Sequence, residues 1–175
     1  MYLVSIYFDE KTNQRLKQYI EQLAQKTGNT FMIDGNVPPH ITVGAFETKQ
    51  EAAVKEGLEQ VFGGLKSGKL QLVSIGTFQT SSIFISAVYN EYLHNMCKAV
   101  CCALGQVDET VIRKNYQPFN WLPHVTIGKT LSKEQQLTAF EELQKSFGPL
   151  EASVLKIGLS KTNPYMDICT WEIPK

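Results

Sequence analysis

One six-residue segment of this 175-residue chain occurs twice in nearly identical form, and this repeat constrains the fold more than any other feature of the sequence. Residues 39–44 read Pro-His-Ile-Thr-Val-Gly, and residues 123–128 read Pro-His-Val-Thr-Ile-Gly, so the second copy lies 84 positions after the first. Successive side chains of a β-strand point to opposite faces. Each copy is therefore predicted to form a strand with β-branched apolar residues on one face and with histidine, threonine and glycine on the other.

The two faces of each predicted strand suit different surroundings. The β-branched face is typical of a surface buried under helices. Polar groups are costly to bury without partners, so His40 and Thr42 are better suited to a wet cleft than to a core. His124 and Thr126 repeat this arrangement in the second copy. The chain is therefore predicted to present two imidazoles, each beside a hydroxyl.

The surroundings of the two copies repeat as well. A capping box follows each histidine by eight residues, at Thr48–Glu51 and at Ser132–Gln135, and predicts the start of a helix. The dipeptides Ile75-Gly76 and Ile157-Gly158 follow the histidines at similar distances. Apolar spacing predicts helices over residues 11–26 and 91–104 and strands over residues 2–8, 69–78, 82–88, 152–160 and 166–173, with a turn at residues 79–81.

These regularities indicate an internal duplication, with an offset of about 84 residues, within a single domain of residues 1–175. Two copies are too few for a solenoid, which needs at least three repeats to bury a continuous core. We expect an α+β fold of two pseudo-symmetric lobes, each an antiparallel sheet with outer helices. A central cleft between the lobes would bring the two His-x-Thr faces together.

The composition argues against several classes of protein. Seventeen Lys and Arg residues balance 17 Asp and Glu residues, which does not favour holding long nucleic acid through bulk positive charge. The chain has no run of 18 apolar residues and no basic leader, so neither a membrane span nor a signal peptide is predicted. The cysteines form no Cys-x-x-Cys pair and favour a reducing compartment. We expect a cytoplasmic monomer.

Two imidazoles that face each other across a cleft can divide acid–base work near neutral pH. Cleavage of a phosphodiester requires one group that deprotonates the attacking water or hydroxyl and another that protonates the leaving oxygen. His40 and His124 are the candidates, and the hydroxyls of Thr42 and Thr126 are placed to bind phosphate oxygens. No cofactor is required, and two histidines without a third ligand make an incomplete zinc site.

Three aromatic residues precede the second motif in an irregular passage and are candidates for substrate binding. Tyr116, Phe119 and Trp121 are close enough in sequence to His124 for a base or sugar in the cleft to stack on them. The alternative is that they close the end of the core. Trp121 is expected to point inward and Phe119 to be the better stacking candidate. His94, the third histidine, is expected to be solvated on the flank of its helix.

The paired motifs, their spacing and the length of the chain resemble the two-histidine (2H) phosphoesterase superfamily, whose members carry twin His-x-Thr/Ser signatures. That superfamily includes the bacterial 2′-5′ RNA ligase-like proteins and cyclic nucleotide phosphodiesterases. The resemblance implies a metal-independent hydrolase of 2′,3′-cyclic phosphates or 2′-5′ linkages in RNA ends or small nucleotides. It assigns acid and base roles to His40 and His124 and phosphate binding to Thr42 and Thr126. Many members carry a basic residue soon after a motif, and here only the second copy supplies one, Lys129.

Several alternatives stay open from the sequence alone. A module that binds RNA ends or a nucleotide without turnover would use the same cleft. The pseudo-symmetry does not distinguish the general acid from the general base, and the motifs do not distinguish hydrolysis from ligation.

Overall fold

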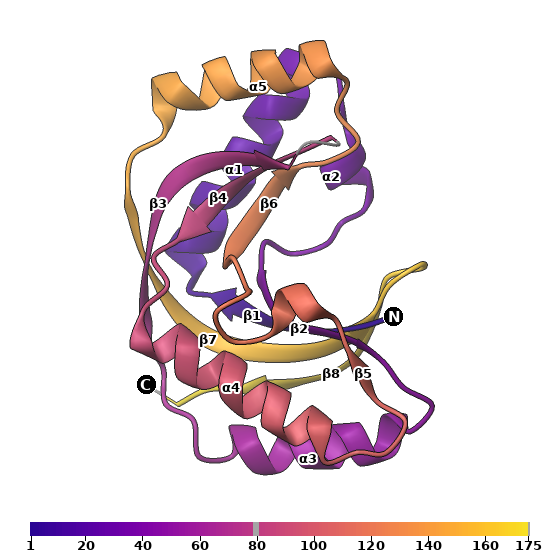
Figure 1. Ribbon diagram of the computed structural model, residues 1–175. Coiled ribbons are helices and arrows are strands. Elements are labelled where there is room, and N and C mark those ends of the chain that lie inside the picture. The colour runs from indigo at the N-terminus through magenta and orange to yellow at the C-terminus, as the bar shows by residue number, and fades with distance from the viewer. Residues whose placement is uncertain (79–80, 175) are drawn as a thin grey trace.

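The computed structural model describes residues 1–78 and 81–174, and its elements follow the predicted order. The turn predicted at residues 79–81 lies partly outside the described residues. Three short elements, α2, β5 and the 3-10 helix η1, were not predicted. The elements are β1 (Tyr2–Phe8), α1 (Glu10–Thr27), α2 (Phe31–Asp34), β2 (Ile41–Glu47), α3 (Glu51–Phe62), β3 (Lys69–Phe78), β4 (Ser82–Ala87), α4 (Glu91–Gly105), β5 (Val111–Ile112), η1 (Lys114–Tyr116), β6 (His124–Gly128), α5 (Lys133–Ser146), β7 (Leu150–Lys161) and β8 (Met166–Glu172) (Figure 1).

The strands form one antiparallel sheet in the order β1-β2-β6-β4-β3-β7-β8, in which β7 also pairs with β1. The first part of β7 pairs with β3, and the remainder lies between β1 and β8. The strands thus fall into two groups, one of β1, β2, β8 and the end of β7, and one of β3, β4, β6 and the start of β7. The groups are continuous through β7 and meet again where β2 touches β6.

Each group of strands is covered by helices from both halves of the chain. Helices α3 and α4 pack together, with α4 against β2, while α1 and α5 pack together against β6 and β4 (Figure 1). Helix α1 follows β1 in the chain but covers the group that contains β3, β4 and β6. Helix α4 follows β4 but covers the group that contains β1, β2 and β8. The result is the expected α+β architecture of two lobes with outer helices. No helix of the described residues is long and apolar enough to cross a membrane.

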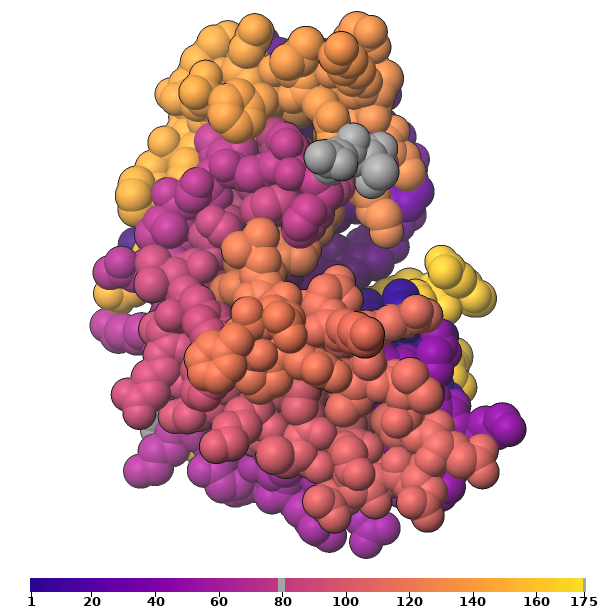
Figure 2. Space-filling view, viewed as in Figure 1, coloured from indigo at the N-terminus to yellow at the C-terminus, as the bar shows by residue number. Residues whose placement is uncertain are grey.

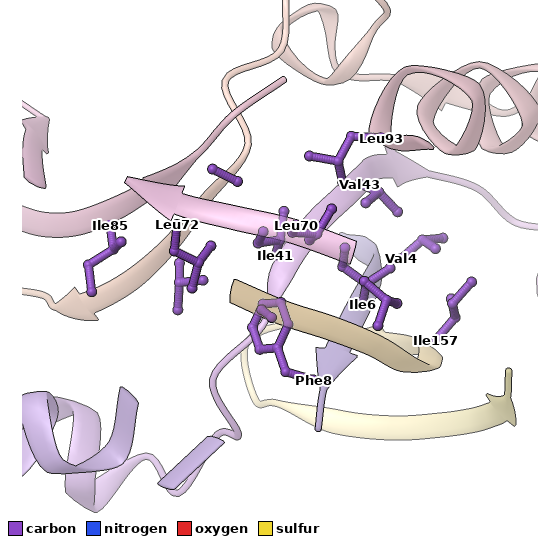
Figure 3. Packing of buried hydrophobic residues seen from close by; sticks show 14 of the residues in the cluster. Val4, Ile6, Phe8, Ile41, Val43, Leu70, Leu72, Ile85, Leu93 and Ile157 are labelled. Atoms are coloured by element: carbon purple, nitrogen blue, oxygen red, sulfur yellow. The ribbon is translucent and has the colours of Figure 1, made fainter. Parts of the chain in front are cut away.

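The apolar faces of the strands meet in one core. Figure 3 shows side chains of both halves of the chain converging, among them Ile6, Ile41 and Ile157, which have no exposed surface. The side chain of Asp9 caps α1 by accepting from Thr12 N at 3.0 Å, and it also accepts from the backbone N of Ser153 in β7 at 2.8 Å. The start of α1 is therefore tied to the sheet as well as to the core.

One of the two predicted capping boxes is present. Ser132 and Gln135 cap α5 reciprocally, as predicted. The Thr48 hydroxyl instead accepts from Gln50 N at 3.0 Å, and α3 begins at Glu51 without a side-chain cap. The prediction at Thr48 was wrong because its hydroxyl is used in a local turn that follows β2. The helix therefore starts later after the first motif than after the second.

Candidate active site

The two His-x-Thr segments lie side by side because β2 and β6 meet at a single bridge. Ile41 pairs with Val125 in antiparallel orientation, and both side chains are fully buried. The sequence neighbours of these two residues point to the opposite face, away from the core. These neighbours are the partly exposed His40, Thr42, His124 and Thr126. The surface is hollowed between the two lobes in the space-filling view (Figure 2).

The same hydrogen bond holds both histidines. Nδ1 of His40 lies 2.8 Å from the carbonyl oxygen of Pro38, and Nδ1 of His124 lies 2.7 Å from that of Leu122. A carbonyl oxygen has no hydrogen, so Nδ1 must be the donor in each bond. In the neutral ring, Nε2 then carries a lone pair. Each imidazole is thereby fixed in the tautomer that can accept a proton at Nε2.

The surroundings favour the neutral form of both rings. Burial lowers the pKa of His40, and the hydrogen bond to its carbonyl partner offsets part of that effect. The charge of His124 lowers the pKa of His40 further, the carboxylate of Asp167 raises it, and the ammonium of Lys129 lowers it. Burial also lowers the pKa of His124, again partly offset by its carbonyl bond. The two imidazoles are thus close enough for the charge on one to affect the other.

A β-bulge after each threonine turns the motif glycine away from the cleft. Thr42 and Gly44 face adjacent residues of β1, and Thr126 and Gly128 face adjacent residues of β4, so β2 and β6 each contain one extra residue. A Cβ added to Gly44 would lie 2.9 Å from Val100 of α4, and one added to Gly128 would lie 2.8 Å from a side chain of β4. The prediction that both glycines share the histidine face was wrong, because a bulge interrupts strict alternation.

An aromatic ring that lies over a glycine backs the imidazole of His124. A Cβ on Gly76 would lie 2.4 Å from Cζ of Phe84, so the ring occupies the space that a side chain would fill. The centroid of this ring is 5.0 Å from that of His124. Phe78 adds a second ring, edge-on to His124 at 4.9 Å. The imidazole of His124 is thus enclosed by two phenylalanines.

His40 has an equivalent backing, with polar groups added. A Cβ on Gly158 would lie 2.9 Å from Cε2 of Tyr7, whose ring centroid is 6.0 Å from that of His40. The Tyr7 hydroxyl lies 3.3 Å from that of Tyr165, which donates to Oδ1 of Asp167 at 2.6 Å. Sequence reasoning missed these residues, although the repeated Ile-Gly dipeptide marked the two glycines that accommodate the rings.

Lys129 lies near the cleft, since its ammonium affects the pKa of His40. Its Nζ is 5.9 Å from the centre of the ring of Phe31 in α2, a residue that sequence reasoning did not select. The Phe31 side chain is 46% exposed, which leaves much of it open to contact with a ligand. Lys129 and Phe31 therefore offer a cation and an aromatic surface next to each other.

The aromatic residues predicted before His124 lie in different surroundings. Trp121 is buried and packs edge-on against Tyr89, which confirms the inward orientation expected for it. Its ring therefore offers no open face on which a base could stack. Tyr116 is half-buried against the core, and its carbonyl oxygen accepts weak hydrogen bonds from the thiols of two unpaired cysteines of α4. Phe119 is 83% exposed, but its ring lies against His94, 4.9 Å between centroids. The described contacts of these three residues thus lie on the α4 side rather than at either motif histidine.

No group of three or more His, Cys, Asp or Glu side chains suited to a metal ion occurs within residues 1–78 and 81–174. The side chains gathered around the bridge between β2 and β6 are two imidazoles, two hydroxyls and a nearby ammonium. Such a set can move protons at two positions and hold an anion between them.

Comparison with solved structures shows the same fold over the whole chain. The crystal structure of TT0787 of Thermus thermophilus has a TM-score of 0.64 at 13% identity, covering 98% of this chain and 97% of that chain. E. coli LigT complexed with 3′-AMP has a TM-score of 0.62 at 14% identity, with 99% and 98% covered. A structure described as a phosphoesterase has a TM-score of 0.61 at 13% identity, with 99% and 98% covered.

Sequence comparison identifies the family. None of the functionally curated proteins matches the chain. The model of the 2′-5′ RNA ligase superfamily matches residues 10–164, a span that contains both His-x-Thr segments and most of the two lobes. The chain therefore belongs to the 2′-5′ RNA ligase superfamily, the two-histidine phosphoesterases that its paired motifs resemble.

Proposed function

We propose that this protein is a metal-independent phosphodiesterase that hydrolyses 2′,3′-cyclic phosphates or 2′-5′ linkages of RNA ends or nucleotides. One observation carries the proposal. Two imidazoles, each fixed at Nδ1 by a carbonyl oxygen, flank the same bridge between β2 and β6 and face the same side of the sheet. A pair of Nε2 atoms held in this way can serve one reaction as base and acid.

In the proposed reaction one imidazole, neutral at the start, takes a proton from water at Nε2. The water oxygen bonds to phosphorus, and the bond from phosphorus to one ribose oxygen breaks. The second imidazole must be protonated at the start, and it transfers its Nε2 proton to the departing oxygen. The product is a phosphomonoester and a free hydroxyl, and proton exchange with solvent restores both rings.

The binding of the substrate phosphate prepares the acid. Burial favours neutral imidazoles in the free protein. A phosphate anion placed between the rings favours the charged form of an imidazole, because an opposite charge within a few ångströms raises the pKa of His. The hydroxyls of Thr42 and Thr126 would donate to the non-bridging oxygens, and Lys129 would offset their charge.

The class of substrate is supported by the relatives. E. coli LigT has been crystallised with 3′-AMP, ATP, NADP+ and phosphate, so that protein accommodates phosphate-bearing nucleotides. We assign the same class of ligand to this chain. The exposed ring of Phe31 beside Lys129 and that of Phe78 beside His124 would provide stacking surfaces for a base.

We also infer that residues 1–175 form one domain that arose by internal duplication. Several features occur once in each half of the chain: the Nδ1 bond to a carbonyl, the bulge after the threonine, and the aromatic ring over a glycine. Such agreement in detail supports a common origin of the halves more strongly than the sequence repeat alone.

Turnover of 2′,3′-cyclic AMP and of 2′-5′-linked adenylyl-adenosine by the purified protein, with EDTA present, tests the proposal. Chromatography of the products should show a phosphomonoester from the first compound and both AMP and adenosine from the second. Saturable binding of both compounds without any product would identify a nucleotide-binding module instead. The absence of both binding and turnover would overturn the assignment of the cleft.

A further inference from the structure

A second hollow opens beside His40 on the same side of the sheet. This cavity of about 460 Å³ lies between the start of α1, the loop before β2 and the strands β7 and β8. Its volume falls within the range of small-molecule sites, about 300–1,000 Å³. The side chains that shape it include Tyr7, Glu10, Tyr165, Asp167, Thr170 and Glu172.

The cavity is continuous with the proposed catalytic face. Tyr7 lines it, and the ring of Tyr7 is also the one that backs the imidazole of His40. Pro38 lines it as well, and the carbonyl oxygen of Pro38 holds Nδ1 of His40. A group attached to a phosphate at His40 can therefore extend over the Tyr7 ring into the cavity.

The charges that line the cavity are unlike those expected for a phosphate site. Three carboxylates, of Glu10, Asp167 and Glu172, stand against one ammonium, that of Lys156, which gives a formal charge of −2. Lys156 is itself bound to Glu172 at 2.9 Å. Carboxylates accept hydrogen bonds from hydroxyl and amino groups and repel a further phosphate. The lining thus suits an uncharged group rich in hydrogen-bond donors.

The other side of the cleft has no equivalent cavity wall. Strand β8 pairs with β7 beyond β1 and lines the cavity. Beyond β4, the further partner of β3 is the start of β7, and it pairs only with Lys69–Leu72, outside the part of β3 that carries Gly76 and Phe78. Phe78 and Phe84 lie beside His124, whereas the corresponding positions near His40 are taken by Tyr7 and Asp167. A substrate with different groups on its two sides would therefore bind in one orientation.

We infer that this cavity binds the second nucleoside of a 2′-5′-linked substrate, an uncharged group joined to the reacting phosphate that carries hydroxyl and amino groups but no phosphate of its own. The inference rests on the proposed function and narrows it, since it favours 2′-5′-linked dinucleotides with an unphosphorylated end over longer chains. Tyr7 and Tyr165 would contact the apolar faces of the nucleoside, and the carboxylates of Glu10 and Asp167 would accept its hydrogen bonds.

The first experiment blocks the cavity with a larger side chain and compares the turnover of two substrates. Thr170 is an exposed residue of β8 that lines it, and Thr170→Trp places a bulky side chain there. The ratio of kcat/KM for 2′-5′-linked adenylyl-adenosine to kcat/KM for 2′,3′-cyclic AMP, which lacks a second nucleoside, should fall at least about tenfold. Met166→Trp, on the same strand and outside the cavity lining, should leave the ratio as in the wild type. An equal loss for both substrates in Thr170→Trp would overturn the inference while the proposed function stands.

The second experiment measures binding and does not depend on turnover. Calorimetric titration of adenylyl-adenosine into His124→Ala protein, with and without Thr170→Trp, should show affinity at least about tenfold weaker in the double variant. In His124→Ala protein, a phosphate added to the nucleoside that occupies the cavity should weaken the affinity for the dinucleotide. Glu10→Gln should recover part of this lost affinity, because it removes one negative charge from the cavity. Unchanged affinity in the double variant would refute the cavity as the nucleoside site, even if the wild type turned over neither substrate.

Discussion

The two halves of the cleft hold their histidines by the same bond but surround them differently. His124 is enclosed by Phe78 and Phe84, whereas His40 lies against Tyr7 in a region that also contains Tyr165 and Asp167. Burial lowers the pKa of both imidazoles, but only His40 is affected by a carboxylate, Asp167, which raises its pKa in part. A repeated backbone frame can therefore carry two chemically distinct sites, and the distinction depends on a few side chains outside the repeated motifs.

The largest expected effect comes from removing either imidazole. His40→Ala and His124→Ala should each lower kcat for 2′,3′-cyclic AMP by about 10²–10⁴-fold, the usual contribution of a general acid or base. His94→Ala is the matched control, because His94 bonds to Tyr89 outside the cleft. Steady-state measurement of kcat for the two variants compares the two halves directly. A loss of kcat in only one variant would show that the two histidines do not both take part in catalysis.

The threonines should give the next largest effect. Thr42→Val and Thr126→Val keep the shape of the side chain and remove its hydroxyl, so each should lower kcat by about 100-fold if the hydroxyl donates to a phosphate oxygen in the transition state. Thr138→Val is the control, because Thr138 is a partly exposed residue of α5 whose hydroxyl donates to the Glu134 carbonyl oxygen of the same helix. Equal losses would indicate that the phosphate lies symmetrically between the strands. Wild-type rates in both variants would refute a role for the hydroxyls.

Substitution of the glycines beneath the aromatic rings tests how tightly the ring behind each histidine is packed. An added methyl group would lie 2.4 Å from the Phe84 ring in Gly76→Ala and 2.9 Å from the Tyr7 ring in Gly158→Ala. Each should lose about 1–3 kcal/mol of unfolding free energy through overpacking, with the larger loss in Gly76→Ala. Urea denaturation measures this, and Gly148→Ala, where no atom lies within 4 Å of the new Cβ, is the control. Unchanged stability in both variants would show that the rings move aside freely.

The smallest effect is a shift in pH dependence that distinguishes the base from the acid. Burial holds the pKa of His40 below its usual value, and Asp167→Asn should lower it further by removing a carboxylate. If His40 is the base, the acid limb of kcat/KM moves to lower pH in this variant. If the limb stays in place, His124 is the base. Asp108→Asn, at an exposed position after α4, is the control.

The same pKa shifts have a predictable sign in stability. Between the lowered folded pKa and the unfolded value of about 6.5, the unfolded chain binds more protons at His40 than the folded chain does. The contribution to stability is therefore complete above about pH 6.5 and is lost as the pH falls through the folded pKa. In Asp167→Asn this window extends to lower pH.

Much of the site could be predicted from the sequence, because it depends on local periodicity. The alternation that places His40 and Thr42 opposite Ile41 needs only a strand, and the buried Ile41 and partly exposed Thr42 agree with it. The cap at Ser132 is equally local and is present. The prediction at Thr48 failed because a hydroxyl can serve a turn as well as a cap.

Local periodicity specified which motif side chains point away from the core, since alternation is a property of the extended backbone. What those side chains face depends instead on contacts between distant segments. The bulges that redirect Gly44 and Gly128 depend on register with β1 and β4, and the exchange of α1 and α4 between lobes depends on packing. Asp167 lies 127 residues after His40 in the sequence (167 − 40). It comes near the histidine only because β8 pairs with β7. Contacts at such separation are set by the whole fold, and no local pattern specifies them.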